Sequence, residues 1–539
     1  MKIAMVPLNS RVGDVAGNLA QMLGFIDEAQ TQGCALVVFP ELALVGYPPK
    51  DWLFYDALLK SQEMAFATLR RRSKKIMILT GAIGKRRGSG CPFTNSAVLF
   101  HNARRQDYAK QLLPNYDVFD EARYFEPGTK PFIIKVGRLR IGVTVCEDIW
   151  SVDAKTAKRY HHDPLKAYAA LKPDLLLNLS ASPYAFGKRA LRRKVCARAA
   201  KLCQATLLHV NQLGANDDLI FDGGAMAFSK RGECLGDSGD FQGTLCLFDT
   251  DTEKLTPSHS PLDDLTALQR ALEIGIADYV HKTGHHQVVL GLSGGIDSAV
   301  VACLAVAALG PKNVLGVLLP SRYTQANSNT DALLLAKALD IQTQAIPIND
   351  LHKTFEGIFE NQFGKTGTLD LTAQNVQARI RGTLLMAIAN NTGRLLLNTT
   401  NKSEMAVGYG TLYGDLCGAL AVLSDVPKTL VYELANQINL RYERIPKRTI
   451  TKAPSAELKP DQQDSDSLPT YDALDPILSE LIDNEQLRLS KNNQPVLKMV
   501  FASEYKRRQA PLGLKVSAKA FGSGRRVPVA GRLSLEKIE

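Results

Sequence analysis

The sequence predicts an α/β protein built from two domains, each with its own core. Its 539 residues exceed what a single hydrophobic core usually serves. Short apolar segments typical of strands alternate with helical segments in both halves, and a polar stretch with two prolines separates the halves. We therefore expect a first domain over residues 1–248, a linker over 249–265 and a second domain over 266–539.

The composition is that of a globular protein, with 45% hydrophobic and 22% charged residues. The longest apolar runs fall short of the roughly 18 residues that a membrane span needs, and the N-terminus, broken by Pro7, resembles a first strand more than a secretory leader. Nine scattered cysteines form no CxxC pair and no zinc-type cluster. These features favour a cytoplasmic protein with reduced thiols and no membrane contact.

The net charge of +11 raises the question of nucleic-acid binding. Most basic residues are dispersed, apart from RRRSKK at 70–75 and a basic C-terminal stretch. Solvated surfaces and the phosphates of a small nucleotide account for such a charge more simply than RNA or DNA. We therefore expect no nucleic-acid partner.

The first half is rich in predicted strands with helices between them. Residues 14–31 and 189–203 are the clearest helical segments. The strand segments are KIAMVPL, ALVVFPE, IMILTGAI, SAVLF, RIGVTVCED, DLLLNLS and TLLHVNQLG. This order indicates a mixed α/β domain.

The second half alternates strand and helix more regularly. Strands are expected in VVLGLS, VLGVLLP, TQAIPI and RLLLNTT, and helices over 298–308, 327–339 and 373–390. Such alternation predicts a doubly wound parallel sheet covered by helices on both faces. Ligands of these sheets bind at the carboxyl ends of the strands.

The segment GLSGGIDS, residues 291–298, joins the first of these strands to a helix. Its glycines let backbone N–H groups approach anionic oxygens, and the helix N-terminus adds a positive field. The lysine of the common phosphate loop is absent, and Asp297 stands where a metal could bridge. Such a loop suits a pyrophosphate that leaves whole, after attack at the α-phosphorus and with release of AMP.

With its SGGxDS loop, this half resembles the N-type ATP pyrophosphatases. NVQARIRG at 375–382, LLLNTTNKSEMAVGYGTLYGD at 395–415 and SEYKRRQAP at 503–511 resemble the NAD synthetases, which amidate the nicotinic acid carboxylate of deamido-NAD. The resemblance spans 270–527 and implies an adenine nucleotide α-hydrolase-like fold. It assigns ATP contacts to Gly291, Leu292, Ser293, Gly294, Gly295, Ile296, Asp297, Ser298, Thr399, Lys428 and Ser455, deamido-NAD contacts to Asn375, Arg379, Glu404, Asp415 and Lys506, and magnesium ligands to Asp297 and Glu404.

The implied chemistry explains these residue types. A carboxylate accepts ammonia poorly, so it first attacks the α-phosphorus to form an acyl-adenylate, and Mg²⁺ and cations offset the charge on the leaving pyrophosphate. Carboxylate oxygens suit Mg²⁺. The C-terminal SAKAFGSGRRVPVA departs from the pattern of glutamine-using members, so the roles of Arg525 and Arg526 stay open.

In the first half, three candidates lie at or just past the ends of predicted strands. They are Glu41 in VVFPELALVGYP, Lys110 in DYAKQLLPNYDVFDEARYFEPG and Cys146 in RIGVTVCEDIW. A cysteine attacks as its thiolate, a nearby ammonium lowers its pKa, and a carboxylate can take its proton. The set supplies a nucleophile, a base and electrostatic support for opening an amide.

These stretches resemble the nitrilase, or carbon-nitrogen hydrolase, superfamily over residues 1–250, which implies an α-β-β-α sandwich. The resemblance makes Glu41 the general base, Lys110 the oxyanion stabiliser, Cys146 the nucleophile that attacks the glutamine amide, and Glu121 a supporting second acid. It places Tyr47, Tyr116, Phe119, Ser182 and Lys188 in or near the glutamine pocket.

Together the two halves are expected to make NAD from deamido-NAD, ATP and glutamine, with ammonia travelling through an interior passage. The resemblance also implies at least a homodimer. Two alternatives stay open at this point. One is an enzyme with the same loop but another acceptor, such as a purine nucleotide or a tRNA base. The other is a basic RNA-binding scaffold with degenerate enzyme domains, which the intact Glu41, Lys110, Cys146 and Asp297 disfavour.

Overall fold

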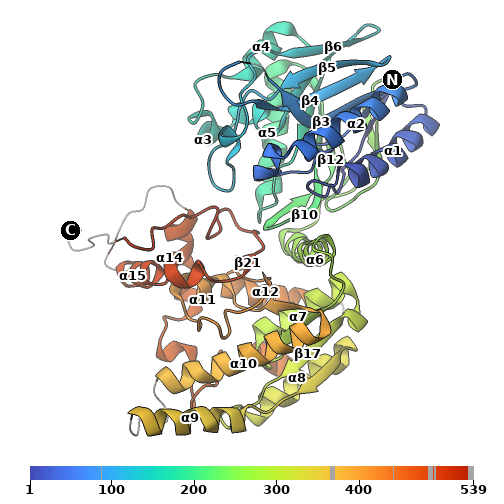
Figure 1. The fold of residues 1–539 in the computed structure, drawn as a ribbon. Coiled ribbons are helices and arrows are strands. Elements are labelled where there is room, and N and C mark those ends of the chain that lie inside the picture. Colours follow the sequence, from blue (N-terminus) through green and yellow to red (C-terminus); the bar gives the residue numbers. More distant parts are fainter. Residues whose placement is uncertain (87, 364–370, 441, 484–489, 491–492, 532–539) are drawn as a thin grey trace. The chain divides into compact units, whose positions relative to one another are not determined.

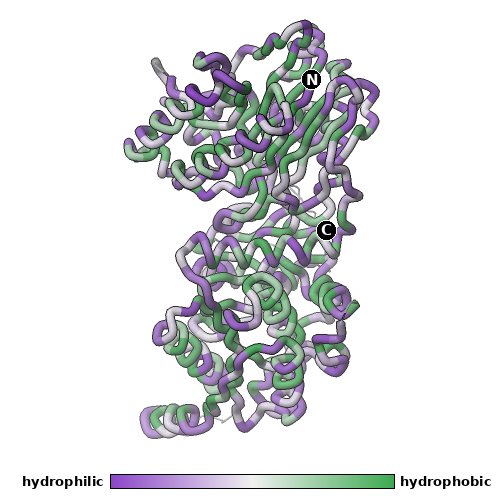
Figure 2. The backbone as a smooth tube through the Cα atoms, turned by 90° about the vertical axis from the view of Figure 1, so that its right-hand side faces the viewer, coloured by the Kyte–Doolittle hydropathy of each residue, from purple (hydrophilic) through white to green (hydrophobic). Residues whose placement is uncertain are grey.

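The computed structural model describes residues 1–539 except 87, 364–370, 441, 484–489, 491–492 and 532–539. The chain forms two compact units, Met1–Ala267 and Leu268–Glu539, which are described separately (Figure 1). Hydrophobic residues follow the strands inside each unit, and hydrophilic residues gather on outer helices and loops (Figure 2). Within the described parts of the chain, every helix is too short or too polar to serve as a membrane span.

The first unit contains two sheets and a hairpin. The seven-stranded sheet has the order β15 (Lys254–Thr256), β14 (Cys246–Asp249), β1 (Lys2–Met5), β2 (Leu36–Val38), β3 (Met77–Lys85), β4 (Phe93–His101), β5 (Arg104–Ala109). The six-stranded sheet has the order β13 (Cys234–Asp237), β12 (Ala225–Phe228), β9 (Thr206–Asn211), β8 (Leu175–Ser180), β7 (Leu139–Val145), β6 (Phe132–Val136). Strands β10 (Leu213–Asn216) and β11 (Leu219–Asp222) form the hairpin.

Alternation along the strands shows how the layers pack. In β8, Leu175, Leu177 and Leu179 belong to the core between the two sheets, whereas Leu176 belongs to the core on the outer, helical face. In β1, Ile3 lies in the core between the sheets, whereas Ala4 lies in the opposite core. The two sheets therefore pack face to face with helices outside both.

The helices of the first unit complete the sandwich. Helices α1 (Val15–Thr31) and α2 (Asp56–Arg72) cover the seven-stranded sheet, and α4 (Pro164–Leu171) and α5 (Lys188–Cys203) cover the other. Short α3 (Ala154–Ala157) and the 3-10 helices η1 (Lys50–Phe54), η2 (Glu121–Arg123) and η3 (Cys146–Val152) lie in connections. The expected α-β-β-α sandwich is confirmed.

The second unit is built on one six-stranded parallel sheet. Its order is β18 (Gln342–Ala345), β17 (Val314–Leu318), β16 (Val288–Gly291), β19 (Leu395–Asn398), β20 (Leu420–Ala421), β21 (Leu512–Gly513). The chain winds outward from β16 to β18 and then resumes at β19 on the other side of β16. The strand order therefore reverses between β16 and β19, where doubly wound folds bind their ligands.

Helices cover this sheet as the sequence predicts. On one face α10 (Leu371–Thr392), which pairs with α9 (Asn349–Phe363), packs Ile380 and Ala389 on β16, β17 and β19. Helix α7 (Ile296–Leu309) contacts β16 and β17 and packs against α8 (Ala326–Leu339) and α12 (Lys428–Asn439). The other helices are α6 (Asp264–Lys282), α11 (Lys402–Val407), α13 (Lys447–Thr451), α14 (Tyr471–Asp483), α15 (Gln494–Ala502) and α16 (Glu504–Arg507), with 3-10 helices η4 (Pro311–Asn313) and η5 (Asp464–Asp466).

The segment expected to be a linker, residues 249–265, is not wholly irregular. Its residues Lys254–Thr256 form β15, which pairs antiparallel with β14 at the edge of the first sheet. The prolines and polar residues suggested an extended connection, but edge pairing satisfies part of its backbone. Helix α6 starts at Asp264, within the last two residues of the segment.

Candidate active sites

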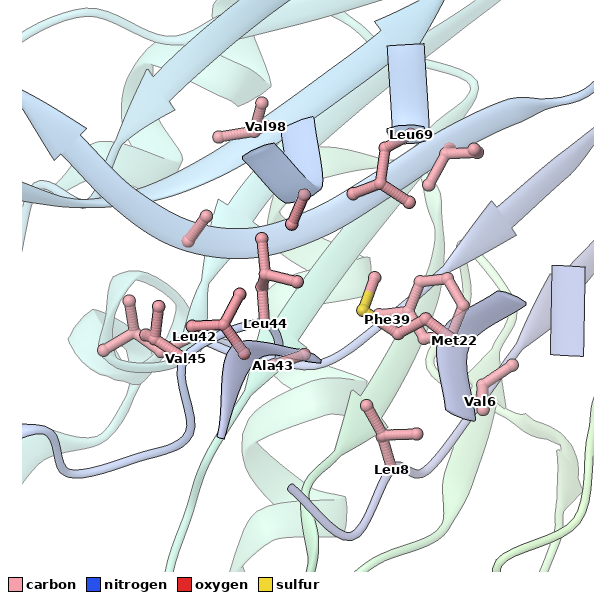
Figure 3. Close-up of a cluster of buried hydrophobic side chains, with 14 of the residues drawn as sticks. Val6, Leu8, Met22, Phe39, Leu42, Ala43, Leu44, Val45, Leu69 and Val98 are labelled. Carbon is pink, nitrogen blue, oxygen red and sulfur yellow. The ribbon is translucent and has the colours of Figure 1, made fainter. Parts of the chain in front are cut away.

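The first unit gathers four predicted residues in its interior. Glu41 follows β2, Lys110 directly follows β5, Glu121 opens η2, and Cys146 follows β7. Each of these residues is at most 4% exposed. Glu41 is held firmly because the next four side chains, from Leu42 to Val45, are buried in the core beneath α1 and α2 (Figure 3).

Lys110 joins the two carboxylates. Its Nζ lies 2.7 Å from Glu41 Oε1, 2.8 Å from Glu121 Oε1 and 2.9 Å from Glu121 Oε2. Asn95 donates to Glu41 Oε1 at 2.7 Å and Tyr47 donates to Glu121 Oε1 at 3.0 Å. The Ala181 backbone N–H donates to Glu41 Oε2 at 2.9 Å. Every buried charge in this group therefore has a partner.

Burial and charge set the protonation of this group. Burial alone would lower the pKa of Lys110, but Glu121 and Glu41 raise it well above its ordinary value. Burial raises the pKa of Glu121 to about 7, against the lowering effect of Lys110. Lys110 therefore stays protonated, and its single ammonium group is shared by the side chains of Glu41 and Glu121.

Cys146 occupies a constrained turn beside this group. Its φ angle is +41°, a left-handed conformation that costs free energy for any residue except glycine. Its Sγ accepts a hydrogen bond from Ser180 Oγ at 3.2 Å. Burial and the charge of Glu41 raise the pKa of the thiol, and Lys110 lowers it. The raised pKa favours the protonated thiol over the thiolate.

Asp148 fixes this turn and was not singled out from the sequence. Its Oδ1 accepts the backbone N–H groups of Gln111 and Leu112, each at 2.9 Å, and its Oδ2 accepts the N–H of Val145 at 2.9 Å. Tyr108 also donates to Oδ2 at 2.7 Å. One buried carboxylate thus ties the segment after Lys110 to the residue before Cys146.

The five residues predicted to shape the glutamine pocket have four different sets of contacts. Tyr47 contacts Glu121, as described. Tyr116 packs edge-on against Phe119, with ring centroids 5.6 Å apart, and donates to Glu147, the residue after Cys146, at 2.8 Å. Ser182 is bonded to Asn211 through its backbone. Lys188 Nζ lies 5.8 Å from the Trp150 ring centroid and donates to the carbonyl of Pro183 at 3.0 Å.

The second unit has a cavity of about 290 Å³ at the point where the strand order reverses. Predicted ATP-site residues line it from the end of β16 and the loop after it, the first turn of α7, the loop after β19, the start of α12 and the loop after α13. These are Gly291, Leu292, Ser293, Gly295, Ile296, Asp297, Ser298, Thr399, Lys428 and Ser455. Gly294 instead packs its backbone against α8: its φ is +76°, and a Cβ there would lie 2.2 Å from the Ser328 carbonyl oxygen.

Three charged side chains meet in this cavity. Lys428 Nζ lies 2.5 Å from Asp297 Oδ2 and 3.3 Å from Glu404 Oε1. Burial raises the pKa of Glu404 to about 7, although Lys428 opposes this. Two carboxylates facing one cation provide oxygen donors that suit Mg²⁺. Among the residues that the structure describes there is no cluster of three or more His, Cys, Asp or Glu side chains that could hold a metal ion.

The residues predicted to contact deamido-NAD gather around residues 408–415. Asp415 and Glu404 line the cavity. Asn375 Oδ1 accepts from the Thr411 hydroxyl at 2.8 Å. Arg379 donates to the carbonyl of Leu412 at 3.3 Å. Lys506 donates to two further carbonyls of this loop, those of Gly408 and Gly410, each at 2.8 Å.

Sequence patterns missed several residues of this cavity. Arg381 lines it and donates to the carbonyl of Leu319 at 3.0 Å; burial lowers the pKa of its guanidinium to about 10. Lys452 and Asp464 also line it. Lys402 of the NKSE segment contacts the C-terminal stretch: its Nζ donates a hydrogen bond to the Ser517 hydroxyl at 2.8 Å. Arg381 and Lys452 lie in the segments that also contain the predicted residues Arg379 and Ser455, but the sequence pattern did not show that these two side chains line the cavity.

Comparison with known proteins agrees with both sites. A family model described as carbon-nitrogen hydrolase matches residues 2–259, and one described as NAD synthase matches residues 268–510. The glutamine-dependent NAD(+) synthetase of Synechocystis sp. is 44% identical over 549 residues, covering 98% of each chain. The chain belongs to the glutamine-dependent NAD(+) synthetase family.

Other members of the family extend this likeness. The glutamine-dependent NAD(+) synthetase of Acinetobacter baylyi is 38% identical over 543 residues, covering 98% of each chain. The solved structure of the Acinetobacter baumannii synthetase in complex with ADP has a TM-score of 0.78, with 35% identity and 98% coverage of each chain. Family membership confirms both resemblances drawn from the motifs. The roles of single residues stay predictions supported by the geometry above.

Proposed function

We propose that this protein amidates deamido-NAD to NAD at the expense of ATP, with nitrogen from glutamine. The observation that carries the proposal is the presence, in one chain, of a buried Cys146–Lys110–Glu41 group and a lysine-free glycine loop bordering a cavity. The first fits amide hydrolysis and the second fits release of pyrophosphate. An enzyme that only hydrolysed amides would not need the second site, and an enzyme that only released pyrophosphate would not need the first.

In the first unit, Glu41 takes the proton of the Cys146 thiol, and the sulfur attacks the amide carbon of glutamine. Lys110 stabilises the negative charge that develops on the carbonyl oxygen. Ammonia leaves, and water releases glutamate from the thioester. Because the pKa of the thiol is raised by burial, proton removal and attack are coupled.

In the second unit, the nicotinate carboxylate of deamido-NAD attacks the α-phosphorus of ATP and pyrophosphate leaves. Asp297 and Glu404 would hold Mg²⁺, which offsets the charge on the phosphates. Ammonia then attacks the acyl-adenylate and AMP leaves. Asp415 of the loop over residues 408–415, together with Asn375, Arg379 and Lys506, which contact that loop, would orient the dinucleotide.

We also propose at least a homodimer and a cytoplasmic location. Helix α9 supports the first, because Leu351, Phe355 and Ile358 are 44%, 43% and 59% exposed on its surface. Nine unpaired thiols support a reducing compartment. Size-exclusion chromatography with light scattering measures the assembly directly, and a strictly monomeric mass contradicts it.

The proposal is tested by Cys146→Ala, with Cys246→Ala as a matched control that removes another buried thiol of the same unit. NAD formation and AMP release are measured with either glutamine or ammonium as the nitrogen donor. We expect Cys146→Ala to lose glutamine-driven synthesis and keep ammonium-driven synthesis, and the control to keep both. Loss of both activities in a folded Cys146→Ala protein, or no NAD from the wild type, contradicts the proposal.

A further inference from the structure

The cavity of the second unit contains Lys452, a lysine to which no role has yet been given. Lys428 is already shared by Asp297 and Glu404, at 2.5 and 3.3 Å. These two carboxylates outnumber that ammonium, so this cluster by itself cannot neutralise an incoming pyrophosphate. Lys452 lines the same cavity, and 23% of its side chain is exposed.

The backbone that carries Lys452 is fixed. Lys452 is the residue that directly follows α13, and its N–H donates to the carbonyl of Arg448 at 2.9 Å. The Arg448 guanidinium grips the buried carboxylate of Asp331 on α8 through three contacts of 2.6 to 3.1 Å. Bidentate arginine–carboxylate pairs of this kind define geometry well. Helix α13 is thereby anchored to α8.

Helix α8 in turn touches the glycine loop. The Gly294 backbone is so close to Ser328 that a Cβ would overlap its carbonyl oxygen, at 2.2 Å. Lys452 Nζ donates to the Ser328 hydroxyl at 3.0 Å. The ammonium therefore lies beside the loop whose N–H groups face the phosphates, although it is far from the loop in sequence.

The ammonium is also available to a new anion. Its nearest carboxylate oxygen, on Glu457, is 3.8 Å away. Glu457 has other donors, the Ser328 hydroxyl at 2.5 Å and the Gln325 backbone N–H at 3.3 Å. Lys452 can turn toward a phosphate without leaving the half-buried Glu457 carboxylate unpartnered.

We propose that Lys452 binds the pyrophosphate portion of ATP and stabilises it as it leaves, the part played by the loop lysine in common phosphate loops. The inference rests on the proposed function and adds a substrate-contacting residue to it. As the carboxylate bonds to the α-phosphorus, the bond from that phosphorus to the bridging oxygen breaks and its electron pair passes to pyrophosphate. The Lys452 ammonium offsets the charge gained there.

The first experiment compares Lys452→Met with Lys452→Arg and with Lys447→Met, which changes an exposed lysine of α13. Ammonium-driven synthesis is used so that the first unit takes no part. We expect Lys452→Met to weaken product inhibition by pyrophosphate about 10- to 100-fold, the usual effect of losing a hydrogen bond between charged groups. Inhibition by AMP should change less than threefold, Lys452→Arg should retain most pyrophosphate inhibition, and Lys447→Met should match the wild type. Equal loss of pyrophosphate and AMP inhibition, or no loss, overturns the inference.

The second experiment uses the wild type and stays decisive if Lys452→Met does not fold. Lysines are acetylated with a limiting reagent, with and without magnesium pyrophosphate at a concentration that inhibits synthesis, and sites are quantified by mass spectrometry. Lys452 should be protected at least fivefold and Lys447 not at all. Unchanged labelling of Lys452 overturns the inference, whereas wild-type protein that forms no NAD overturns the proposed function instead.

Discussion

Replacing Asp148 by asparagine tests whether one buried carboxylate positions Cys146, the proposed nucleophile. The change keeps the shape of the side chain and its Oδ1, which accepts the N–H groups of Gln111 and Leu112. It turns Oδ2 into an NH2 group that faces the N–H of Val145, formerly bonded at 2.9 Å. Two donors then confront each other next to Cys146.

The cost follows from this geometry. A buried donor without an acceptor costs about 1–3 kcal/mol. The Tyr108 hydroxyl can rotate and accept from the new NH2 group, so only the Val145 N–H is stranded. We expect the first unit to lose about 1–3 kcal/mol of stability. A displacement near 1 Å at a reacting atom costs about 100-fold in rate, so glutamine-driven kcat should fall about 10- to 100-fold.

The assay follows NAD formation with saturating glutamine and, separately, with ammonium, and thermal unfolding reports the stability. Tyr108→Phe is the matched control, because it removes a donor to the same oxygen but strands no backbone N–H group; the Gln111 side-chain amide loses its acceptor at 3.2 Å. Ammonium-driven kcat should stay within twofold of the wild type in both variants. Glutamine-driven kcat within twofold of the wild type in a folded Asp148→Asn protein would refute the positioning argument.

Three further changes have definite outcomes. Gly294→Ala places a Cβ 2.2 Å from the Ser328 oxygen at a φ of +76° and should reduce ammonium-driven kcat/KM for ATP at least tenfold, as initial rates show. The pKa of Glu121 is raised from 4.5 to about 7 by burial, so the stabilisation that its proton gives the fold is complete below 4.5 and lost as the pH rises to 7. Glu121→Gln should flatten this dependence in thermal unfolding. Lys402→Met removes the bonds that anchor the C-terminal stretch and should speed limited proteolysis near 512–531.

Each of these three predictions has an outcome that would contradict it. Wild-type ATP kinetics in Gly294→Ala would mean that α8 yields to the extra methyl group. An unfolding midpoint of the first unit that does not vary from pH 4.5 to 7 would refute the raised pKa of Glu121. Lys447→Met is the control for Lys402→Met. If the rate of proteolysis near 512–531 in Lys402→Met equals that of the control, contacts other than those of Lys402 anchor the C-terminal stretch.

Long periodic elements could be predicted from the sequence, and short ones could not. The helix expected over 327–339 is observed as Ala326–Leu339, because its apolar face repeats over four turns. Strands β20 and β21 have two residues each and are defined only by pairing with distant partners. No local pattern could have indicated them.

The same distinction holds for the sites. Strand ends and the glycine loop pointed to Glu41, Lys110 and the cavity, because position in an α/β fold follows from local pattern. Asn95 was missed although it donates to Glu41 at 2.7 Å, since 54 residues separate the two in the chain. Polar groups that act through distant partners become visible only in the fold.

Leucine on both sides of β8 has a consequence for how the strand finds its neighbours. A slip by one residue would still bury leucine on either face, so hydrophobicity alone leaves the pairing frame ambiguous. Thr144, Asn178 and His209 stand abreast on β7, β8 and β9, linked at 3.1 and 2.9 Å. A slip of β8 would turn the Asn178 amide to the opposite face of the sheet and leave the His209 imidazole on β9 without this partner, at about 1–3 kcal/mol for each stranded group. This polar row therefore fixes the register of β8, the strand whose last residue, Ser180, donates a hydrogen bond to the Cys146 sulfur.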